Sequence, residues 1–303
     1  MKKIGLSIGA YQNKFGDLDA LEIAKKIGCD TVDFDLCGGR WDYKNPSSVY
    51  AKSDEEIVEY FTKVKEKAAE VGIEISQTHG RISGLMPNEE ENVDLFENMR
   101  RDCLATKTMG APICVVHSAT TCRFGPDADP EFMHNNNERM FREYLGFAKQ
   151  YGIKLATETF GDAPNFGCCD FFGNNFEFLR SFHRLSAIDD FKDYLEICMD
   201  TGHCNKALRF NNNPTPANFI RTCGRHITCL HLNDNNTLTD QHKMPFSGSI
   251  DWEDVFNALD EVGYNGAYNM ELALGFYGKE VMVETGEFAV KVLRNYLNKR
   301  YGE

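Results

Sequence analysis

The feature that most constrains the fold is a repeated alternation of short, apolar, β-rich runs with longer runs of helical periodicity along the whole chain. The predicted strands are residues 3–9, 31–36, 73–79, 113–118, 154–159, 196–200, 227–232 and 267–272. The predicted helices are residues 17–27, 54–71, 90–109, 135–151, 174–187, 216–223, 251–262 and 279–299. Strands that are apolar almost throughout are typical of a parallel sheet buried on both faces. Eight strand–helix units in succession therefore predict an α/β fold, a (β/α)8 TIM barrel that forms a single domain over residues 1–303.

Local signals support the predicted helix boundaries. Ser53 followed by Glu56 is a capping-box pattern, and apolar residues at helical spacing come after it. Four glycines follow a helical run and precede a strand, as residues that end a helix do: Gly72, Gly110, Gly152 and Gly263. An open doubly wound sheet is the alternative architecture, but it usually has fewer units, and no Gly-x-Gly-x-x-Gly follows an early strand.

Three long loops follow predicted strands, at residues 37–52, 119–134 and 233–250. A barrel enzyme carries its active-site loops on the side where its strands end. No linker, low-complexity segment or compositional break divides the chain. The three loops therefore mark the face on which we expect an active site.

The composition limits the partners that the chain can bind. Its 33 Lys and Arg against 46 Asp and Glu give a net charge of −13, which repels a phosphate backbone, so we expect no nucleic-acid partner. No apolar run approaches the roughly 20 residues needed to span a membrane, and residues 1–9 resemble a strand rather than a signal peptide. The 11 cysteines are scattered, many of them in apolar runs, as buried thiols in a reducing compartment are. We expect a cytoplasmic protein without a membrane partner.

Ionisable side chains recur where the predicted strands end. Six consecutive strands carry a histidine or a carboxylate at or near the C-terminal end: His79, His117, Glu158, Asp200 with His203, His231 and Glu271. In a barrel these ends converge on one mouth. Several carboxylates buried near one another raise each other's pKa, and a divalent cation removes that penalty. The pattern therefore favours a metal site over an uncharged polar cluster.

The residue types narrow the choice of metal. Carboxylates and imidazoles with open positions for water or substrate suit Mn²⁺, Mg²⁺, Co²⁺ or Zn²⁺. No cysteine lies beside these residues in a ligand pattern, which disfavours a thiolate site. Asp240 and His242 form an Asp-x-His pair in the loop after the seventh strand. A solvated loop pair is the simpler interpretation of such a pair, but its position shortly after His231 favours a functional one.

Together these motifs resemble the sugar phosphate isomerase/epimerase superfamily, the xylose-isomerase-like TIM barrels that include ketose 3-epimerases, inosose dehydratase and endonuclease IV. The motifs are Asp200-Thr201-Gly202-His203, His231-Leu232-Asn233-Asp234 with Asp240-Gln241-His242, and Gly248-Ser249-Ile250-Asp251-Trp252. The resemblance covers nearly the whole chain. It implies that the metal ligands are Glu158, Asp200, His231 and Glu271. It also implies that Glu158 and Glu271 are the catalytic acid/base pair.

The same resemblance leaves the number of metal ions open. Endonuclease IV holds three zinc ions with a larger ligand set, and this chain has further matches to that set at His79, His117, His203, Asp240 and His242. We expect these five residues to bind substrate or a second metal, and by resemblance to the epimerases His203 would touch a substrate hydroxyl. Mn²⁺ is the favoured ion, with Mg²⁺, Co²⁺ and Zn²⁺ as alternatives. Relatives often form dimers or tetramers, so a homo-oligomer is an open alternative.

The segment before Ile250 departs from the family pattern. The family commonly has two glycines there as Gly-x-Gly, whereas Phe246 takes the place of the first. A bulky ring is expected to reshape the rim, so that the substrate need not be a simple free sugar. Further aromatic residues are expected in the mouth loops, where they stack on a sugar or an aglycone or pack only on each other: Trp41, Phe160, Phe166, Phe171 and Phe172.

The expected site can support more than one reaction. A metal on a substrate carbonyl and the neighbouring hydroxyl acidifies the adjacent C–H, and Glu158 or Glu271 removes that proton to give a metal-stabilised enediolate. Return of the proton gives an epimer or an isomer, whereas loss of a β-hydroxyl is dehydration. We expect a metal-dependent isomerase or epimerase that acts on a sugar or a sugar-like polyol. The alternatives are a lyase (a dehydratase or a β-eliminating, glycoside-cleaving enzyme), a nuclease, and a non-enzymatic carbohydrate-binding barrel, since the fold does not decide.

Overall fold

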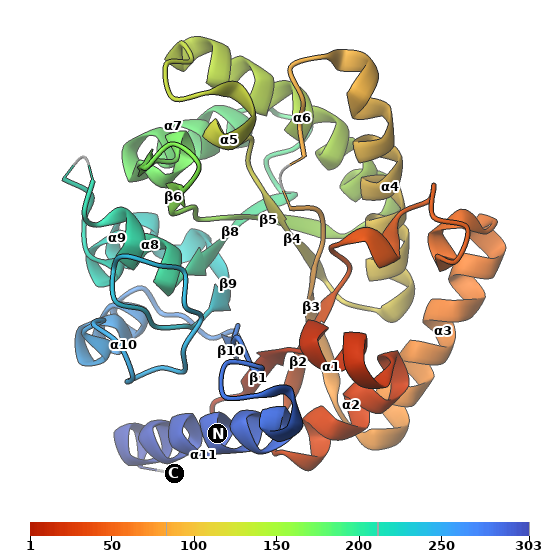
Figure 1. Ribbon diagram of the computed structural model, residues 1–303, viewed down its shortest axis with the longest axis vertical. Helices are drawn as coiled ribbons and strands as arrows, with labels where there is room; N and C mark the ends of the chain where they lie inside the picture. Colours follow the sequence, from red (N-terminus) through yellow and green to blue (C-terminus); the bar gives the residue numbers. More distant parts are fainter. Residues whose placement is uncertain (83, 211, 303) are drawn as a thin grey trace.

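The structure is a computed structural model that describes residues 1–82, 84–210 and 212–302. In these residues eight parallel strands form one sheet in the order β10-β1-β2-β3-β4-β5-β8-β9. The strands are β1 (Ile4–Ser7), β2 (Thr31–Asp35), β3 (Glu74–His79), β4 (Ile113–His117), β5 (Lys154–Glu158), β8 (Leu195–Asp200), β9 (Ile227–His231) and β10 (Tyr268–Met270). The Leu232 N–H donates to the Asn269 carbonyl at 2.8 Å, which links β9 to β10 and brings the two ends of the sheet together (Figure 1). The predicted barrel is confirmed.

Helices surround the barrel on its outside (Figure 1). The α-helices are α1 (Gly9–Phe15), α2 (Asp17–Lys26), α3 (Asp54–Val71), α4 (Val93–Met109), α5 (Thr121–Phe124), α6 (Pro130–Tyr151), α7 (Asn175–Ser186), α8 (Thr201–Ala207), α9 (Pro216–Cys223), α10 (Trp252–Glu261) and α11 (Met282–Tyr301). Short 3₁₀ helices are η1 (Gly39–Trp41), η2 (Val49–Ala51), η3 (Glu89–Asn92), η4 (Phe171–Gly173), η5 (Gly224–His226) and η6 (Lys279–Val281). A small hairpin, β6 (Asp162–Ala163) with β7 (Cys168–Cys169), lies in the loop after β5.

The predicted helices are all present, with some ends shifted. Helix α6 begins five residues before the predicted start at 135, because the Asp129 side chain caps it and Pro130 occupies its first turn. The predicted helices 90–109 and 279–299 each begin with a 3₁₀ turn. Short helices such as α1 and α8 were not predicted, since they follow strand ends directly and are too brief to show helical periodicity.

The predicted start and stop signals are confirmed in the structure. Ser53 Oγ accepts the Glu56 N–H at 3.3 Å, and the Glu56 carboxylate accepts the Ser53 N–H at 3.1 Å. Gly72, Gly110 and Gly152 end their helices at φ of 70°, 82° and 67°, in the left-handed region that favours glycine. These signals set the lengths of α3, α4 and α6, and therefore the points at which the next strands enter the barrel.

The outer helices are amphipathic. In α3 the buried positions are Ile57, Phe61, Val64 and Ala68, which recur at helical spacing. In the part of the chain that the structure describes, no helix is long and apolar enough to cross a membrane.

The interior of the barrel has two different walls. The apolar wall comes from β4, β5, β8 and β9 and consists of Ile113, Val115, Ala156, Cys198 and Cys229. The polar wall comes from β1, β2, β3 and β10 and consists of Ser7, Thr31, Asp33, Gln77 and Asn269. Barrel interiors are usually filled by branched apolar side chains. The polar wall is therefore a departure that calls for a specific reason.

Candidate metal centre

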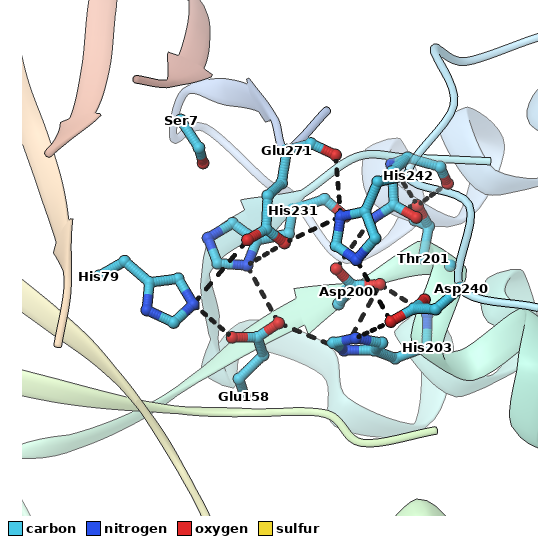
Figure 2. A network of polar contacts seen from close by, with 12 residues as sticks. Ser7, His79, Glu158, Asp200, Thr201, His203, His231, Asp240, His242 and Glu271 are labelled. Atoms are coloured by element: carbon cyan, nitrogen blue, oxygen red, sulfur yellow. Dashed lines mark hydrogen bonds and ion pairs between the residues drawn. The ribbon is translucent and has the colours of Figure 1, made fainter. Parts of the chain in front are cut away.

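Four side chains with ligand atoms meet at the C-terminal mouth of the barrel (Figure 2). Glu158, Asp200 and His231 are the last residues of β5, β8 and β9, and Glu271 directly follows β10. Each offers one ligand atom, and these four atoms all lie within 4.8 Å of one another. Glu158, Asp200 and His231 have no exposed surface. Three carboxylates and one imidazole therefore surround a space of the size that one small cation needs.

Glu158 is the centre of this cluster. Its Oε1 lies 3.1 Å from His231 Nδ1 and 3.3 Å from His203 Nδ1. Its Oε2 lies 3.0 Å from His117 Nε2 and 3.3 Å from His79 Nε2. Four imidazoles thus approach one buried carboxylate.

Several ligand atoms in the cluster lack a hydrogen-bond partner. Among the described residues, both carboxylate oxygens of Glu158, Nδ1 of His231 and Oε2 of Glu271 are buried without a hydrogen bond of acceptable geometry. Buried polar atoms in folded proteins are nearly always paired. Oxygen and imidazole nitrogen are good ligands for small divalent cations. The unpaired atoms and their chemistry therefore fit a metal ion.

The pKa shifts show how the charges in the mouth balance. Burial alone would raise the pKa of Glu158, but His117 and His231 hold it well below its ordinary value. Burial raises the pKa of Asp200 to about 6, and Glu158 adds to this shift while His203 opposes it. Burial acts to lower the pKa of His79, yet Glu158 and Glu271 raise it to about 10. The carboxylates thus draw positive charge into the mouth, as a cation site does.

A second group of possible ligands lies beside the first. The ligand atoms of His203, Asp240 and His242 lie within 4.8 Å of one another. Asp240 Oδ2 is 3.4 Å from His203 Nε2 and 3.3 Å from His242 Nε2. His242 Nδ1 is 3.5 Å from Glu271 Oε2, which connects the two groups. His79 and His117 form a third group with Glu158. The structure therefore brings together all nine site residues that the sequence singled out.

The loop that carries Asp240 and His242 is anchored by Asp234. The fully buried Asp234 carboxylate accepts from the Gly248 N–H at 2.9 Å, the Ile250 N–H at 3.2 Å and the indole N–H of Trp252 at 2.8 Å. A Cβ on Gly248 would lie 2.2 Å from Asp234 Oδ1, so the close approach requires glycine. The motif around Gly248 is thus a loop anchor rather than part of the ligand set.

A buried ion-pair cluster supports the same loop from the other side. Lys206 Nζ lies 2.6 Å from Asp162 Oδ1, and both side chains are almost fully buried. Arg209 donates to Asp162 Oδ2 at 2.6 Å and to the Thr237 carbonyl at 2.7 Å. Lys206 Nζ is also 3.9 Å from Asp240 Oδ1. The cluster thus places the positive charge of Lys206 beside Asp240 and ties Arg209 to the same loop, and the sequence analysis did not single it out.

Two more acidic residues near the mouth were missed. Asp33 lies in β2 and its Oδ2 is 2.9 Å from His231 Nε2. Asp35, at the end of β2, forms a possible ligand group with Cys37 and His79. Cys37 thus joins a possible ligand group around His79, whereas the possible ligand groups that contain Glu158 include no cysteine among the described residues. The signal was present, because Asp35 and Cys37 occupy the same strand-end position as the residues that were chosen.

Phe246, which was expected to lie at the rim of the mouth, packs against the outer helices instead. Phe246 packs its ring on Trp252, Phe256 and Tyr296 of the outer helices, with centroid distances of 5.5, 6.3 and 4.8 Å, so the prediction that it reshapes the rim is wrong. Its φ of 73° turns the ring toward those helices.

The other expected rim residues also divide between core and mouth. Trp41 is buried against Tyr50 and Phe61. Phe171 and Phe172 pack on His134, so these three rings belong to the core and its edge. Phe160 alone of this set contacts site residues: its centroid lies 5.0 Å from that of His117 and 6.3 Å from that of His203. Phe166 is largely exposed.

Comparison with known families supports the fold that the barrel shows. A family model described as xylose isomerase-like TIM barrel matches residues 21–275. Two relatives are the uncharacterized protein y4fM of Sinorhizobium fredii, 24% identical over 196 residues, and the uncharacterized protein MJ1311 of Methanocaldococcus jannaschii, 27% identical over 203 residues. These alignments cover 62% and 64% of this chain, and the chain spans only 55% and 62% of the relatives' own lengths.

Solved structures share the fold over almost the whole chain. A D-tagatose 3-epimerase-like protein has a TM-score of 0.70 at 21% identity, covering 98% of this chain and 97% of its own. The 3-keto-D-glucoside 4-epimerase YcjR of E. coli has a TM-score of 0.70 at 17% identity, covering 97% and 100%. The IolI protein with a bound zinc atom has a TM-score of 0.68 at 16% identity, covering 99% and 97%. At these identities the likeness establishes the fold alone.

Proposed function

The chain belongs to the xylose isomerase-like TIM barrel family, and on that premise we propose that it is a divalent-metal-dependent isomerase or epimerase of a sugar or a sugar-like polyol. The observation that carries the proposal is the group Glu158, Asp200, His231 and Glu271, in which buried ligand atoms lack partners among the described residues. Solved structures of the same fold that are described as sugar epimerases support the substrate class.

We propose that these four residues hold the metal. When bound, the metal supplies Lewis acidity that lowers the pKa of the substrate C–H beside the carbonyl. Mn²⁺ remains the favoured ion, since three carboxylates outnumber one imidazole, and the zinc atom of the IolI protein supports Zn²⁺ as the alternative. Mg²⁺ and Co²⁺ suit the same donor set. His203, Asp240 and His242 have the donor types to bind substrate hydroxyls or a second ion.

Glu158 and Glu271 are the proposed acid/base pair. Their side chains come from β5 and from the end of β10, which are not neighbours in the sheet, so they approach a bound substrate from different directions. Burial would raise the pKa of Glu271, but His231 and His242 hold it below its ordinary value, so both carboxylates are ionised and can accept a proton. One glutamate removes the proton from carbon. Return of a proton to the opposite face by the other glutamate, after that glutamate has taken up a proton from solvent, gives the epimer. Return of the abstracted proton by the first glutamate to the neighbouring carbon gives the isomer.

A lyase on the same scaffold is the second candidate. The observation that favours it is the pair of imidazoles around Asp240. Burial acts to lower the pKa of His242, but Glu271 and Asp240 raise it to about 9, so this side chain can give a proton to a leaving oxygen. Loss of a β-hydroxyl or of a glycosidic oxygen after C–H cleavage would then compete with reprotonation of carbon.

Metal content is the first test of the proposal. Inductively coupled plasma mass spectrometry on the purified wild type is expected to give about one bound divalent ion per chain, held by the group Glu158, Asp200, His231 and Glu271. Glu271→Gln is expected to lose most of this metal. The matched control is Glu253→Gln, which changes an exposed glutamate at the start of α10. A wild type that binds none of the four ions after incubation with each would contradict the proposal.

Solvent exchange then separates the two candidate reactions. The metal-loaded protein is incubated with ketoses and inososes in deuterated water. An isomerase or epimerase incorporates deuterium at carbon and conserves the substrate's composition, whereas a lyase releases water or an aglycone that mass spectrometry detects. Exchange that persists in Glu158→Gln would remove Glu158 from the acid/base pair.

A further inference from the structure

The carboxylate of Asp33 contacts the ring nitrogen of His231 that points away from the proposed metal ligands. Asp33 lies in the middle of β2 and is fully buried, and its Oδ2 is 2.9 Å from His231 Nε2. The other ring nitrogen, Nδ1, lies 3.1 Å from Glu158 Oε1 and 3.4 Å from Glu271 Oε2. The ring of His231 therefore stands between Asp33 and the ligand group (Figure 2 shows the ring above Glu158).

The Asp33 carboxylate is held by the polar wall of the barrel. Its Oδ2 accepts from the Ser7 hydroxyl at 3.1 Å and from the Gln77 amide at 3.2 Å. The Asn269 amide donates to Ser7 Oγ at 3.2 Å, which extends the network to β10. Four strands thus contribute to the position of one carboxylate, with β9 bringing His231 to it as a fifth.

The geometry at Asp33 determines which ring nitrogen of His231 carries the hydrogen. A carboxylate oxygen only accepts hydrogen bonds, so the ring nitrogen 2.9 Å away must donate. The Gln77 amide nitrogen lies 3.2 Å from the same ring nitrogen and 3.2 Å from Asp33 Oδ2, but the ring nitrogen is closer to that oxygen, at 2.9 Å, and the charged carboxylate is the stronger acceptor. A neutral imidazole with its hydrogen on Nε2 has its lone pair on Nδ1, the atom that faces Glu158 and Glu271.

The burial of Asp33 is not explained by the stability of the core. Its Oδ1 is buried without a hydrogen-bond partner in the described part of the chain. Burying a carboxylate costs free energy that pairing seldom recovers in full, and an apolar residue usually fills such an interior position. The ring of His79 stacks on His231 with a centroid distance of 5.3 Å and an angle of 5°, so packing alone already limits movement of that ring. What Asp33 adds is the choice of the nitrogen that donates.

We propose that Asp33 is a positioning residue of the metal centre, which fixes His231 with its hydrogen on Nε2 so that Nδ1 is presented to the cation. The inference rests on the proposed function, because it assigns Asp33 a role toward the metal that Glu158, Asp200, His231 and Glu271 hold. Carboxylates that orient metal-binding histidines in this way change metal affinity by about 10–100-fold. Ser7 and Gln77 act one step further out, by holding Asp33.

The first measurement is the dissociation constant for Mn²⁺ and Zn²⁺, obtained by competition with a chromophoric chelator. Asp33→Asn keeps the shape of the side chain and removes its charge, and is expected to weaken binding about 10–100-fold. The matched control is Thr31→Val, a buried position two residues earlier in β2 whose hydroxyl has no hydrogen-bond partner in the described part of the chain. The control is expected to bind metal as the wild type does.

The second measurement is made on metal-free protein and does not depend on activity. A slowly exchanging ring N–H proton is expected in the downfield region of the proton NMR spectrum, assigned to His231 by its loss in His231→Gln. In Asp33→Asn this resonance is expected to move or to exchange too fast to be seen. A role limited to stability would lower the melting temperature and leave both this proton and the metal affinity unchanged.

The outcomes separate this inference from the proposed function. Equal affinities in wild type and Asp33→Asn, with the ring proton unmoved, overturn the role of Asp33 alone. A wild type that binds no metal overturns the proposed function and this role with it, whatever the ring proton shows. If Asp33→Asn does not fold, Ser7→Ala takes its place, since it removes one donor to Asp33 and is expected to shift the proton and weaken binding to a smaller extent. No change in that variant overturns the inference.

Discussion

Gly202 and Asn233 are packed so closely that a Cβ on Gly202 would lie 1.8 Å from Asn233 Oδ1. The Asn233 amide donates to Asp200 Oδ2 at 2.8 Å, and Asp200 Oδ1 accepts the His203 N–H at 2.6 Å. Asp200 is thus the cap of α8 as well as a proposed metal ligand. A side chain at position 202 would occupy the place of the Asn233 amide, which donates to Asp200. Gly202 therefore helps to position Asp200 as a proposed metal ligand.

Gly202→Ala is expected to push the Asn233 amide away from Asp200. Inserting a methyl group into such a packed site is expected to lower the free energy of unfolding by about 1–3 kcal/mol. The affinity for Mn²⁺ or Zn²⁺ should fall as well, since Asp200 loses a hydrogen bond that fixes it. Urea denaturation and a metal titration measure the two effects.

Gly146→Ala is the control for this substitution. Gly146 lies inside α6 with no heavy atom within 4 Å of an added Cβ, so alanine is expected to stabilise the protein by about 0.5–1 kcal/mol through helix propensity. Metal affinity should not change. Wild-type stability and affinity in Gly202→Ala would contradict the role assigned to the close approach.

The stability of the metal-free protein is expected to fall as the pH rises from 6.5 to 10. Burial opposes the charging of His79, but Glu158 and Glu271 raise its pKa from 6.5 to about 10. A group whose pKa is raised on folding stabilises the folded state fully below its unfolded value and loses that contribution as the pH rises through the folded value. Melting temperatures measured across this range in the presence of a chelator test the prediction.

Two variations identify the source of this pH dependence. His79→Gln should reduce it, because one of the groups that titrate in this range is gone and His242, whose pKa is raised to about 9, remains. Saturating Mn²⁺ or Zn²⁺ should also flatten it, because the cation then supplies the positive charge that Glu158 and Glu271 otherwise draw from the imidazoles. Metal-free protein that is equally stable at both ends of the range would show that the carboxylates do not hold His79 protonated.

The convergence of the proposed ligands could be predicted because it depends only on topology. Glu158, Asp200 and His231 end three consecutive strands of the barrel, and parallel strands of a barrel deliver their last residues to one mouth. A strand assignment that is correct to within a residue or two therefore suffices. The second group follows for a related reason, since Asp240 and His242 lie in the loop that leaves the same mouth.

Asp33 and Phe246 could not be predicted in this way. Asp33 lies in the middle of a strand, so its approach to His231 depends on the register of β2 and on the stagger of the barrel. The direction of the Phe246 ring depends on a positive φ and on aromatic rings of α10 and α11 that no local pattern brings to it. Both contacts join segments that are remote in sequence and whose relative heights only the folded structure defines.

Phe246→Ala is expected to lower stability without changing metal affinity. The ring contacts Trp252 and Tyr296 on the outer helices, and aromatic pairs of this kind contribute about 0.5–1.5 kcal/mol each beyond the area they bury. Because the ring does not face the mouth, the dissociation constant for Mn²⁺ should equal that of the wild type. Weaker metal binding by this variant would contradict the placement of the Phe246 ring away from the mouth.

Lys206→Met tests whether the buried ion pair behind the second ligand group holds the loop of Asp240. Its ammonium group lies 2.6 Å from Asp162, and both side chains are almost fully buried. Removing one partner of a buried pair is expected to lower the free energy of unfolding by about 3–5 kcal/mol. The loss in this variant is expected to be smaller, because Arg209 still pairs with Asp162. The matched control is Lys149→Met, whose partner Asp190 lies 3.1 Å away on the surface and where a loss of less than about 1 kcal/mol is expected. Urea denaturation compares the two variants, and limited proteolysis reports on residues 236–247, which should be cleaved faster in Lys206→Met alone. Similar losses of stability in both variants, with the loop equally resistant to the protease, would mean that Arg209 alone holds Asp162. Lys206 would then not be needed to hold the loop of Asp240.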